Sequence, residues 1–307
     1  MEEKQVAPKV SAIVVSWNNA AQLRRCLEAL ERSTNRQEME VVVVDCGSQD
    51  ESPRMDADFP AINMLRLPRH FGIVKALNIG MRTAVGEYFL LLPPEVELQP
   101  DTSGKLAAAL DATSEAVAVC PLSLSPEGDA VTRYRSVPVP REAAQAWRDG
   151  DFADWAPAER DAEPVLIEYP NVPVFMARAN FLKGMRYIDE RYGNSGWDLE
   201  LCCQIRRAAK HILLLPRVSV IIHPTPAGIP SPAARAQLSA DRALSIAMYA
   251  GKHFSWSAGA KTRIGITLHA IKGALASLVT FREVRYHFAL LSALISGQKI
   301  DGSQSAF

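Results

Sequence analysis

Residues 39–50 read Met-Glu-Val-Val-Val-Val-Asp-Cys-Gly-Ser-Gln-Asp (MEVVVVDCGSQD), and this stretch decides the fold class. Continuous apolar runs rich in β-branched residues are typical of strands that are buried on both faces, as in a parallel sheet. The run ends on the carboxylate of Asp45, and Gly47 lets the chain turn sharply because glycine has no side chain to restrict it. Ser48 and Asp50 can then cap a following helix. Asp45 therefore either accepts N–H groups from a base or ribose at the mouth of a sheet, or simply holds the turn.

The same alternation of strand and helix continues on both sides of this stretch. Val10–Trp17, Ile62–Leu67 and Glu87–Leu92 are further short apolar runs, and a helix is expected over Thr102–Ala112. Apolar residues recur at helical spacing at Leu23, Cys26, Leu27 and Leu30, and again at Val74, Leu77 and Met81. Strand–helix–strand alternation predicts an α/β fold: a Rossmann-like, mostly parallel sheet flanked by helices. Ligands of such sheets bind at the carboxyl ends of the strands.

The second half of the chain is less regular. Residues 125–170 are rich in Pro, Arg and Asp, and we interpret them as a partly helical excursion that covers a site, with disorder as the alternative. Pattern returns in a strand at Val172–Ala177, a helix from Trp197 to Ala209 and a strand at Ile212–Ile222. A proline-rich linker precedes helices expected near Ser239–Ala250, Lys261–Thr280 and Phe281–Ser296. We therefore expect a nucleotide-binding and catalytic domain over residues 1–230 and a helical extension over residues 231–307.

Composition excludes several classes of protein. The chain has 307 residues, of which 48% are hydrophobic and 22% charged, which is too apolar for a disordered protein. Its 34 basic residues balance 34 acidic ones, so no net field favours nucleic acid as a partner. The balance conceals a basic tail, because residues 231–307 contain nine Lys and Arg against three Asp and Glu. Such an asymmetry indicates a surface-binding segment.

The cysteines and the apolar runs indicate a cytoplasmic protein. The five cysteines are odd in number and form no Cys-x-x-Cys pair, which argues against a disulfide framework and a zinc cluster. The N-terminus has no apolar core of the kind a signal peptide needs. The longest apolar stretch, residues 264–280, is interrupted by His269 and Lys272, so we expect no transmembrane span.

Four further groups of polar residues can carry chemistry, and each also has a structural interpretation. Lys75 and Asn78 lie one helical turn apart after Arg69; they either contact a ligand or, for Asn78, tie loops together. Glu95 and Glu97 follow a buried strand and either ligate a hard cation or are solvated.

Asp198 and Glu200 fall in the first turn of a helix, where negative charge complements the helix dipole. The alternative for Asp198, beside Trp197, is a general base. His223 closes a strand and precedes a proline. A lone histidine in such a place is more often structural than a metal ligand.

Read in order, these segments resemble the inverting family-two glycosyltransferases with the GT-A fold, in particular their bacterial rhamnosyltransferase-like branch. The segments that carry the resemblance are VSWNN (residues 15–19), VVVVDCGSQD, FGIVKALNIGMRTAVGEYFLLL, YIDERYGNSGWDLELCCQIRRA and VIIH. No single segment is specific, but five in the right order point strongly to this fold. The resemblance runs from about Val10 to His223 and continues more weakly into the C-terminal helices.

The resemblance implies roles for individual residues. Asp198 would be the catalytic base, Trp197 would contact the acceptor, and Glu95 with His223 would bind Mn²⁺ or Mg²⁺. The residues that would bind the nucleotide-sugar donor are Ser16, Trp17, Asn18, Asp45, Gly47, Ser48, Lys75 and Asn78. We expect the side chains of Asp45, Glu95, Asp198 and His223 to converge on one nucleotide-diphosphate pocket at one rim of the sheet.

Two positions depart from the family pattern. The D-x-D motif of the family reads Pro93-Pro94-Glu95 here, so a proline that cannot ligate replaces the first carboxylate. We therefore expect metal binding to be weakened or lost, with Glu97 as a substitute ligand. Trp197 stands where the family usually has Glu, although the following Asp198 is kept.

The C-terminal segment has two interpretations. Apolar residues from Ile264 to Leu278 and from Val284 to Ile295 fall at helical spacing among several Lys and Arg residues. Such helices either lie on an anionic inner membrane leaflet near a lipid-linked acceptor or pack on the catalytic domain or on a second subunit in a homodimer. The membrane interpretation places the protein in the cytoplasm, peripheral to the inner membrane face.

The leading functional prediction is an inverting glycosyltransferase that moves a sugar from a nucleotide-diphosphate donor to a hydroxyl of a glycan or lipid-linked acceptor, in cell-surface polysaccharide synthesis. The alternative is a catalytically silent module with the same fold, which Pro93 and Trp197 favour. A nucleotidyltransferase is a third possibility, but it would need a glycine-rich basic loop after the first strand, and SWNNAAQLRR has none.

Overall fold

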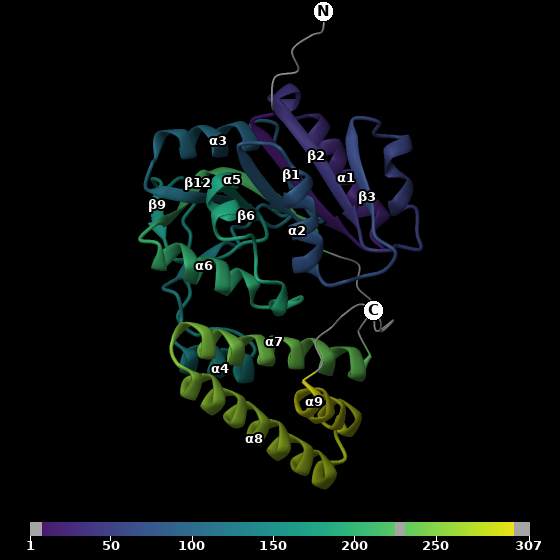
Figure 1. The fold of residues 1–307 in the computed structure, drawn as a ribbon, viewed down its shortest axis with the longest axis vertical. Coiled ribbons are helices and arrows are strands. Elements are labelled where there is room, and N and C mark those ends of the chain that lie inside the picture. The colour runs from purple at the N-terminus through teal and green to yellow at the C-terminus, as the bar shows by residue number, and fades with distance from the viewer. Residues whose placement is uncertain (1–7, 225–230, 298–307) are drawn as a thin grey trace, which may run out of the picture. The chain divides into compact units, whose positions relative to one another are not determined.

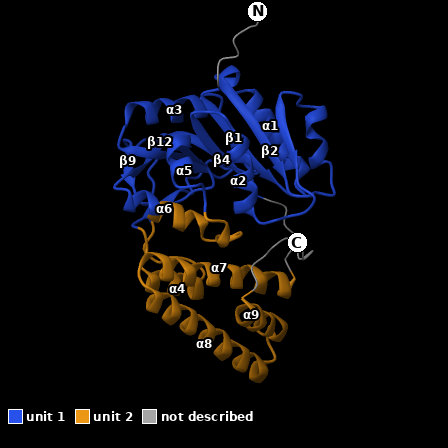
Figure 2. Cartoon of the chain, viewed as in Figure 1, with its two compact units in different colours: residues 1–136, 156–188, 204–225 blue, residues 137–155, 189–203, 226–307 orange. Residues whose placement is uncertain are grey.

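The computed structural model describes residues 8–224 and 231–297 of the chain. The chain divides into two compact units (Figure 2). Unit 1 comprises residues 1–136, 156–188 and 204–225, and unit 2 comprises residues 137–155, 189–203 and 226–307. Two segments that the sequence analysis assigns to the first domain, residues 137–155 and 189–203, thus belong to unit 2 with the C-terminal helices.

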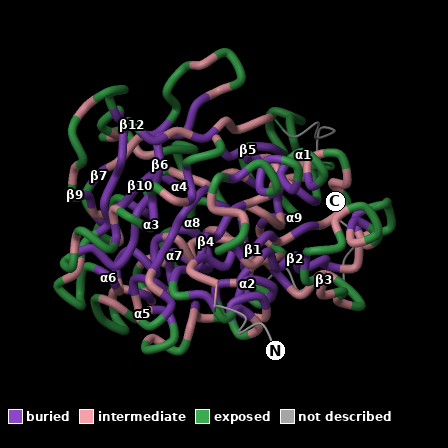
Figure 3. The backbone as a smooth tube through the Cα atoms, turned by 90° about the horizontal axis from the view of Figure 1, so that it is seen from above, coloured by how far each residue is buried: buried purple, intermediate pink, exposed green. Residues whose placement is uncertain are grey.

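Four parallel strands form the N-terminal half of the sheet of unit 1. They are β1 (Val10–Ser16), β2 (Met39–Asp45), β3 (Ile62–Arg66) and β4 (Tyr88–Leu92). β1 pairs in parallel with β2 and β4, and β2 pairs in parallel with β3. Every residue of β4 is buried, as a continuous apolar run requires (Figure 3). The predicted strands and their parallel arrangement are therefore confirmed.

The sheet continues with strands of both directions. Its order is β3-β2-β1-β4-β11-β6-β12-β5, with β9 also paired to β12. β11 is antiparallel to β4 and β6, whereas β12 is parallel to β6. The bounds of these strands are β5 Val96–Leu98, β6 Ala116–Leu124, β9 Val165–Ile167, β11 Phe175–Arg178 and β12 His211–Ile222. β6 was not expected from the sequence, although all of its residues are buried.

Helices cover both faces of this sheet (Figure 1). α1 (Ala20–Glu31) and α3 (Thr102–Ala112) share one hydrophobic core with alternate residues of the strands, including Ala12 and Val14 of β1. α2 (Ile73–Thr83) packs on the opposite face, where a Cβ atom on Gly80 would lie 2.6 Å from Cγ2 of Ile13. The shared core of α1, α3 and the strands is what holds the carboxyl ends of β1, β2 and β4 in register.

Shorter elements complete unit 1. A second, three-stranded sheet has the order β10-β7-β8. Its strands and the remaining helices of unit 1 are β7 Arg133–Arg135, β8 Ala156–Pro157, β10 Tyr169–Asn171, the 3₁₀ helices η1 Arg36–Glu38 and η2 Ser52–Ala57, and α5 Ala179–Gly184. The strands β7, β8 and β9, the start of β10, and α4 of unit 2 lie in the segment of residues 125–170 that the sequence predicts as an irregular, partly helical excursion.

Unit 2 is helical. α4 packs with α7, α8 and α9 around a core of alanines, Trp147, Ile266, Leu290 and Leu294. The elements are α4 Pro140–Asp149, the 3₁₀ helix η3 Glu190–Tyr192, α7 Pro232–His253, α8 Trp256–Thr280 and α9 Val284–Ser296. α6 (Trp197–Arg207) begins in unit 2, to which its residues 197–203 belong.

Several helix boundaries differ from the predicted ones, and two of the differences have local reasons. α7 begins at Pro232 rather than Ser239, because the Ser231 side chain accepts a hydrogen bond from the Ala234 N–H (3.1 Å) and proline is tolerated in a first helical turn. α9 begins at Val284 rather than Phe281, since Phe281 and Glu283 have left-handed backbones (φ 56° and 53°) that interrupt the helix. Part of the predicted proline linker, residues 225–230, lies outside the described residues.

Within residues 8–224 and 231–297, the model contains no helix with the length and apolar character needed to cross a bilayer.

The parallel core makes β4 sensitive to loss of volume. Leu90 is fully buried and lies between Ala12 of β1 and Met176 of β11. We expect Leu90→Ala to lower the free energy of unfolding by about 2–5 kcal/mol, because it removes apolar contacts and leaves a cavity. Val85→Ala, at a side chain that is 61% exposed, is the control and should change it by less than about 0.5 kcal/mol. Urea unfolding followed by circular dichroism measures both; equal effects would contradict the core described here.

Candidate functional site

The turns that follow β1 and β2 are joined by hydrogen bonds. The Asn18 N–H donates to Oγ of Ser48 (2.9 Å), and the Gln49 N–H donates to Oδ1 of Asn18 (2.8 Å). The Cys46 N–H donates to the Ser16 carbonyl (2.9 Å). Asn18 has a left-handed backbone (φ 49°), which asparagine tolerates better than most residues. These contacts place six of the residues predicted to bind the donor, 16–18 and 45, 47 and 48, in two adjacent turns at the carboxyl edge of the sheet.

Asp45 ends β2 with a carboxylate that is 1% exposed. Its Oδ2 atom accepts hydrogen bonds from the N–H groups of Gly47 (3.1 Å) and Ser48 (3.0 Å). Its Oδ1 atom is buried and has no hydrogen-bond partner among the described residues. An unpaired buried oxygen of this kind is unfavourable, because it has lost water without gaining another donor. Asp45 thus both holds the turn and offers a free acceptor.

The turn after Asp45 accepts only glycine at its second position. Gly47 has φ +74°, and a Cβ atom there would lie 2.7 Å from Cα of Arg69. The close approach brings residues 68–70, which follow β3, against the turn. Glycine is therefore favoured at position 47 for two reasons, the positive φ angle and the close approach of the Arg69 backbone.

Two cations and two aromatic rings follow β3. The guanidinium of Arg69 and the ammonium of Lys75 each lie 4.7 Å from the ring centroid of Phe71, and both residues are exposed. Trp17, from the turn after β1, contacts His70 edge to face with ring centroids 5.4 Å apart. Cation–π contacts restrain Arg69 and Lys75 while leaving their charges available to an anion.

Asn78 holds a backbone segment within unit 1. Its side chain donates to the Ile188 carbonyl (2.7 Å) and accepts from the Ile188 N–H (3.1 Å), and the residue is 1% exposed. This pairing is the loop-tying role that the sequence allowed for the buried amide. A contact of Asn78 with a donor stays a prediction.

The predicted metal ligands lie at the end of β12 and the start of β5. The His223 N–H donates to the Glu95 carbonyl (2.9 Å), so the two residues are adjacent. The His223 ring, however, pairs with Glu97, with Nε2 2.8 Å from Oε2, and Arg32 contacts the other oxygen of Glu97 (3.2 Å). Burial raises the pKa of Glu95.

These residues do not by themselves fit a divalent cation. Pro93 and Pro94 offer no side-chain ligand. The described part of the chain contains no group of three or more His, Cys, Asp or Glu side chains arranged to hold a metal ion. The carboxylate that pairs with the His223 ring belongs to Glu97, which the sequence analysis suggested only as a substitute metal ligand. Glu95 and His223 as metal ligands remain a prediction.

The predicted base, Asp198, and the predicted acceptor contact, Trp197, begin α6 in unit 2. Both are partly exposed. The preceding Gly196 has φ +77°, and a Cβ atom there would lie 3.0 Å from Cβ of Ser245 on α7. The start of α6 is therefore packed closely on α7. The expected convergence of Asp198 with Asp45 stays a prediction, because the two residues belong to different units.

The carboxylate of Glu200, two residues after Asp198, lies at the centre of a charged network within unit 2. Glu200 is 3% exposed and accepts hydrogen bonds from the Tyr192 hydroxyl (2.7 Å) and the Lys252 ammonium (2.6 Å), and it also contacts Nε2 of His253. Lys252 also reaches Asp189 (2.8 Å). This network fixes the first turn of α6 to the end of α7.

Sequence reasoning gave Glu200 only a place in the helix dipole. The partners Lys252 and His253 are more than 50 positions away, and nothing in the spacing connects them with Glu200. A glutamate between Leu199 and Leu201 was the one available sign of burial.

The network shifts the pKa values of its members. Burial alone would lower the pKa of His253, but hydrogen bonds to Cys203 and Glu200 and the charge of Glu200 raise it to about 9. Hydrogen bonds from Arg191 and Lys252 hold the pKa of Asp189 well below its usual range. Burial and the nearby Glu200 raise the pKa of Tyr192. His253 is therefore charged at neutral pH, and it helps to neutralise Glu200.

Comparison with known proteins agrees with this architecture. Residues 11–157 match the family model of glycosyl transferase family 2. The succinoglycan biosynthesis protein ExoO of Rhizobium meliloti is 31% identical over 117 residues, which cover 36% of this chain and 32% of that protein. A Haemophilus influenzae protein named as an uncharacterized glycosyltransferase is 26% identical over 102 residues, or 33% of this chain and 34% of that one. The matched region spans about a third of the length of these relatives.

Solved structures show the same fold. GalNAc-T7, crystallised with UDP, GalNAc and Mn²⁺, superposes with a TM-score of 0.57 at 16% identity, covering 73% of this chain and 45% of that one. S. aureus TarS 1-349 superposes with a TM-score of 0.53 at 16% identity, covering 94% of this chain and 92% of that one. The fold is thus the GT-A fold of glycosyltransferases. Through residues 11–157, the chain is similar to glycosyl transferase family 2.

The raised pKa of His253 predicts a pH-dependent stability. Protonated His253 stabilises the folded state, so this contribution is complete below about pH 6.5 and is lost as the pH rises through about 9. Near neutral pH, we expect the free energy of unfolding of the wild-type protein to be higher than that of His253→Gln. This difference should shrink in alkaline buffer. His211→Gln, at an exposed histidine, is the control. Urea unfolding across this pH range is the measurement; a difference that stays constant with pH would contradict the assignment.

Proposed function

We propose that the chain is an inverting glycosyltransferase that moves a sugar from a nucleotide-diphosphate donor to a hydroxyl group of a glycan or lipid-linked acceptor. The observation that carries the proposal is the buried Oδ1 atom of Asp45, a free acceptor at the carboxyl edge of a GT-A sheet. Ligands of parallel sheets bind at this edge. The match to glycosyl transferase family 2 supports the same conclusion.

The donor half of the reaction is assigned to unit 1. In this proposal Asp45 accepts an N–H group of the nucleotide base, and the turns that carry Ser16, Trp17 and Ser48 surround the nucleoside. Arg69 and Lys75 face solvent with their charges held over Phe71. They would offset the negative charge that develops on the leaving diphosphate as the glycosidic bond breaks.

The acceptor half is assigned to the first turn of α6. Asp198 would take a proton from the acceptor hydroxyl, and the resulting oxygen nucleophile would attack the anomeric carbon from the face opposite the diphosphate. A single displacement of this kind inverts the configuration at that carbon. Trp197 would provide an apolar wall against which a sugar ring can stack. The Glu200 network supports this role because it fixes the helix that carries Asp198.

We assign no step to a metal ion. A divalent cation would help to neutralise the diphosphate, as the Mn²⁺ in the GalNAc-T7 crystal suggests for that protein. The residues present here do not assemble a ligand set, since the His223 ring pairs with Glu97 and two prolines precede Glu95. Arg69 and Lys75 therefore carry the electrostatic part of the proposal.

The likeness to a succinoglycan biosynthesis protein supports a role in polysaccharide synthesis. We propose a cytoplasmic location at the inner membrane face, where lipid-linked acceptors are assembled, and keep a homodimer as the competing use of the C-terminal helices. A catalytically silent nucleotide-binding module is the second candidate function. Pro93 and Trp197 favour it, because both replace family carboxylates.

Asp45→Asn tests the donor site. The amide oxygen can still accept the N–H groups of the turn, whereas the amide nitrogen replaces the free acceptor at Oδ1. We expect the dissociation constant for UDP, dTDP or GDP, whichever binds the wild-type protein best, to rise about ten- to hundredfold, the value of a hydrogen bond to a charged group. Asp58→Asn, at an exposed carboxylate of unit 1, should bind like wild type. Isothermal titration calorimetry measures each constant; unchanged binding by Asp45→Asn would refute the donor site.

Asp198→Asn separates the enzyme from the silent module. We expect the rate of transfer or donor hydrolysis, across a panel of nucleotide sugars, to fall about 10²–10⁴-fold while nucleotide affinity stays unchanged, since a general base acts on the acceptor. Asp149→Asn, at an exposed carboxylate on α4, is the control in the same unit. Wild-type protein that binds nucleotide but turns over no donor would contradict the enzyme and favour the silent module.

A further inference from the structure

The helix α8 places its side chains opposite to the usual arrangement. Its buried positions are mostly small residues: Gly259, Ile266, Ala270, Ala274 and Ser277. Its large aliphatic side chains are exposed: Ile264 (59%), Leu268 (60%), Ile271 (37%), Leu275 (60%), Leu278 (48%) and Val279 (80%). Globular proteins rarely leave a contiguous apolar stripe of this length in water. We call these six residues the α8 apolar face.

The α8 apolar face is continuous along the helix. Its members from Ile264 to Leu278 recur at intervals of three or four residues, so they share one side of the helix over about four turns. The buried residues recur at the same intervals on a different side and pack on α7 and α9. Among the large aliphatic side chains of α8, packing within unit 2 therefore uses Ile266 but not the six of the α8 apolar face.

Positive charge borders this face. Lys261 and Lys272 are exposed and lie about three turns apart beside the stripe. Arg263 is also exposed, but it follows the buried Gly259 by four residues and lies on the side toward α7. Exposed apolar and basic side chains continue beyond the end of α8. Phe281 and Arg282 lie in the turn before α9, and Arg285 lies in its first turn. No Asp or Glu occurs from Trp256 to Arg282. The following Glu283 is paired with Arg235 (2.9 Å).

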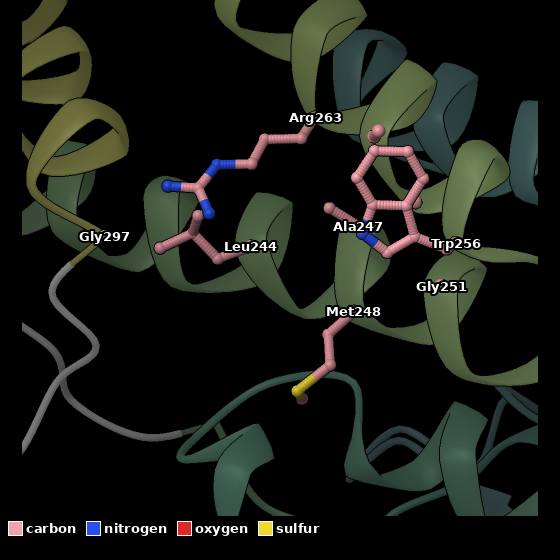
Figure 4. Close-up of a pocket in the computed structure, with 9 residues that line it drawn as sticks. Leu244, Ala247, Met248, Gly251, Trp256, Arg263 and Gly297 are labelled. Carbon is pink, nitrogen blue, oxygen red and sulfur yellow. The ribbon is translucent and has the colours of Figure 1, made fainter.

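One flank of the face has the features of a membrane interface. Trp256 at the start of α8 is 85% exposed. It lines a hollow of about 480 Å³ between α7 and α8, together with Met248, Ala260 and Arg263 (Figure 4). Figure 4 shows the Trp256 ring and the Arg263 guanidinium on the same hollow. An amphipathic tryptophan and a nearby cation suit the headgroup region of a bilayer.

We infer that the α8 apolar face docks in the plane of an anionic phospholipid bilayer, with Lys261 and Lys272 on the lipid headgroups. The arrangement is that of an interfacial helix: a large apolar face, a cationic border and no acidic residue. A second copy of the chain is a poorer partner, because a symmetric contact would bring like charges together around the face. Docking of this kind would place the proposed glycosyltransferase beside a lipid-linked acceptor. Only the identity of that acceptor rests on the proposed function.

Vesicle binding without donor or acceptor tests this inference separately from the proposed activity. We expect full-length protein to sediment with vesicles of phosphatidylcholine and phosphatidylglycerol, but weakly with phosphatidylcholine alone, and to be released by high salt. Lys261→Gln and Lys272→Gln should each lower the partition coefficient about fivefold. The double variant Leu268→Gln/Leu275→Gln should abolish binding, because it removes two side chains that enter the lipid.

Controls keep the outcomes separable. Val85→Gln, at an exposed apolar residue of unit 1, should bind vesicles like wild type. Circular dichroism of each variant confirms folding, which exposed positions should preserve. Protein that stays in the supernatant with anionic vesicles would overturn the inference, whatever its activity. A concentration-dependent dimer in sedimentation equilibrium that Leu268→Gln/Leu275→Gln abolishes, with no vesicle binding, would also overturn it and assign the face to a second copy.

Discussion

The parallel pairing of β1 with β2 is the constraint on which the site in unit 1 depends. The register sets Ser16 opposite Asp45, so both strands end at one edge and their turns meet there. Asp45 then receives the N–H groups that close its own turn, while Asn18 and Ser48 join that turn to its neighbour. A buried carboxylate with one oxygen satisfied and one free results from this geometry.

Much of this arrangement was predictable because it depends on local sequence. The run Met39–Asp45 and the helix Thr102–Ala112 have the bounds that the apolar pattern predicts, since strands buried on both faces and amphipathic helices each leave a distinct period. The strand β6 was missed although it is fully buried. Its run contains Pro121, and a proline inside an apolar run argues against a central strand.

Contacts between residues far apart in the sequence were not predictable. Asn78 finds its partner at Ile188, 110 positions away, and Glu200 finds Lys252 and His253 at the end of another helix. The sequence indicated that Asn78 is buried but gave Glu200 only a place at the helix dipole, and a single chain carries no signal that pairs either residue with its partners. The ring partner of His223 is Glu97 rather than Glu95 for a similar reason, because strand pairing and side-chain reach decide between two glutamates two positions apart.

The two units divide the proposed chemistry. Unit 1 carries the residues proposed to bind the nucleotide, but it has prolines where the resemblance implies a metal-binding carboxylate, so the proposed donor site relies on Arg69 and Lys75. Unit 2 has the proposed base on a helix that the Glu200 network holds, and a cationic apolar helix for the inferred membrane contact. Because α8 buries mostly small residues, most of its large aliphatic side chains stay exposed for the inferred contact with the bilayer.

The central claim is that a nucleoside diphosphate binds at the carboxyl edge of β1 and β2 through Asp45. A crystal structure of the protein grown with the nucleotide that calorimetry shows to bind best tests it most directly. The account predicts a base N–H within hydrogen-bond distance of Oδ1 of Asp45, with the diphosphate toward Arg69 and Lys75. A nucleotide bound elsewhere, with Oδ1 of Asp45 still unpaired, would contradict it.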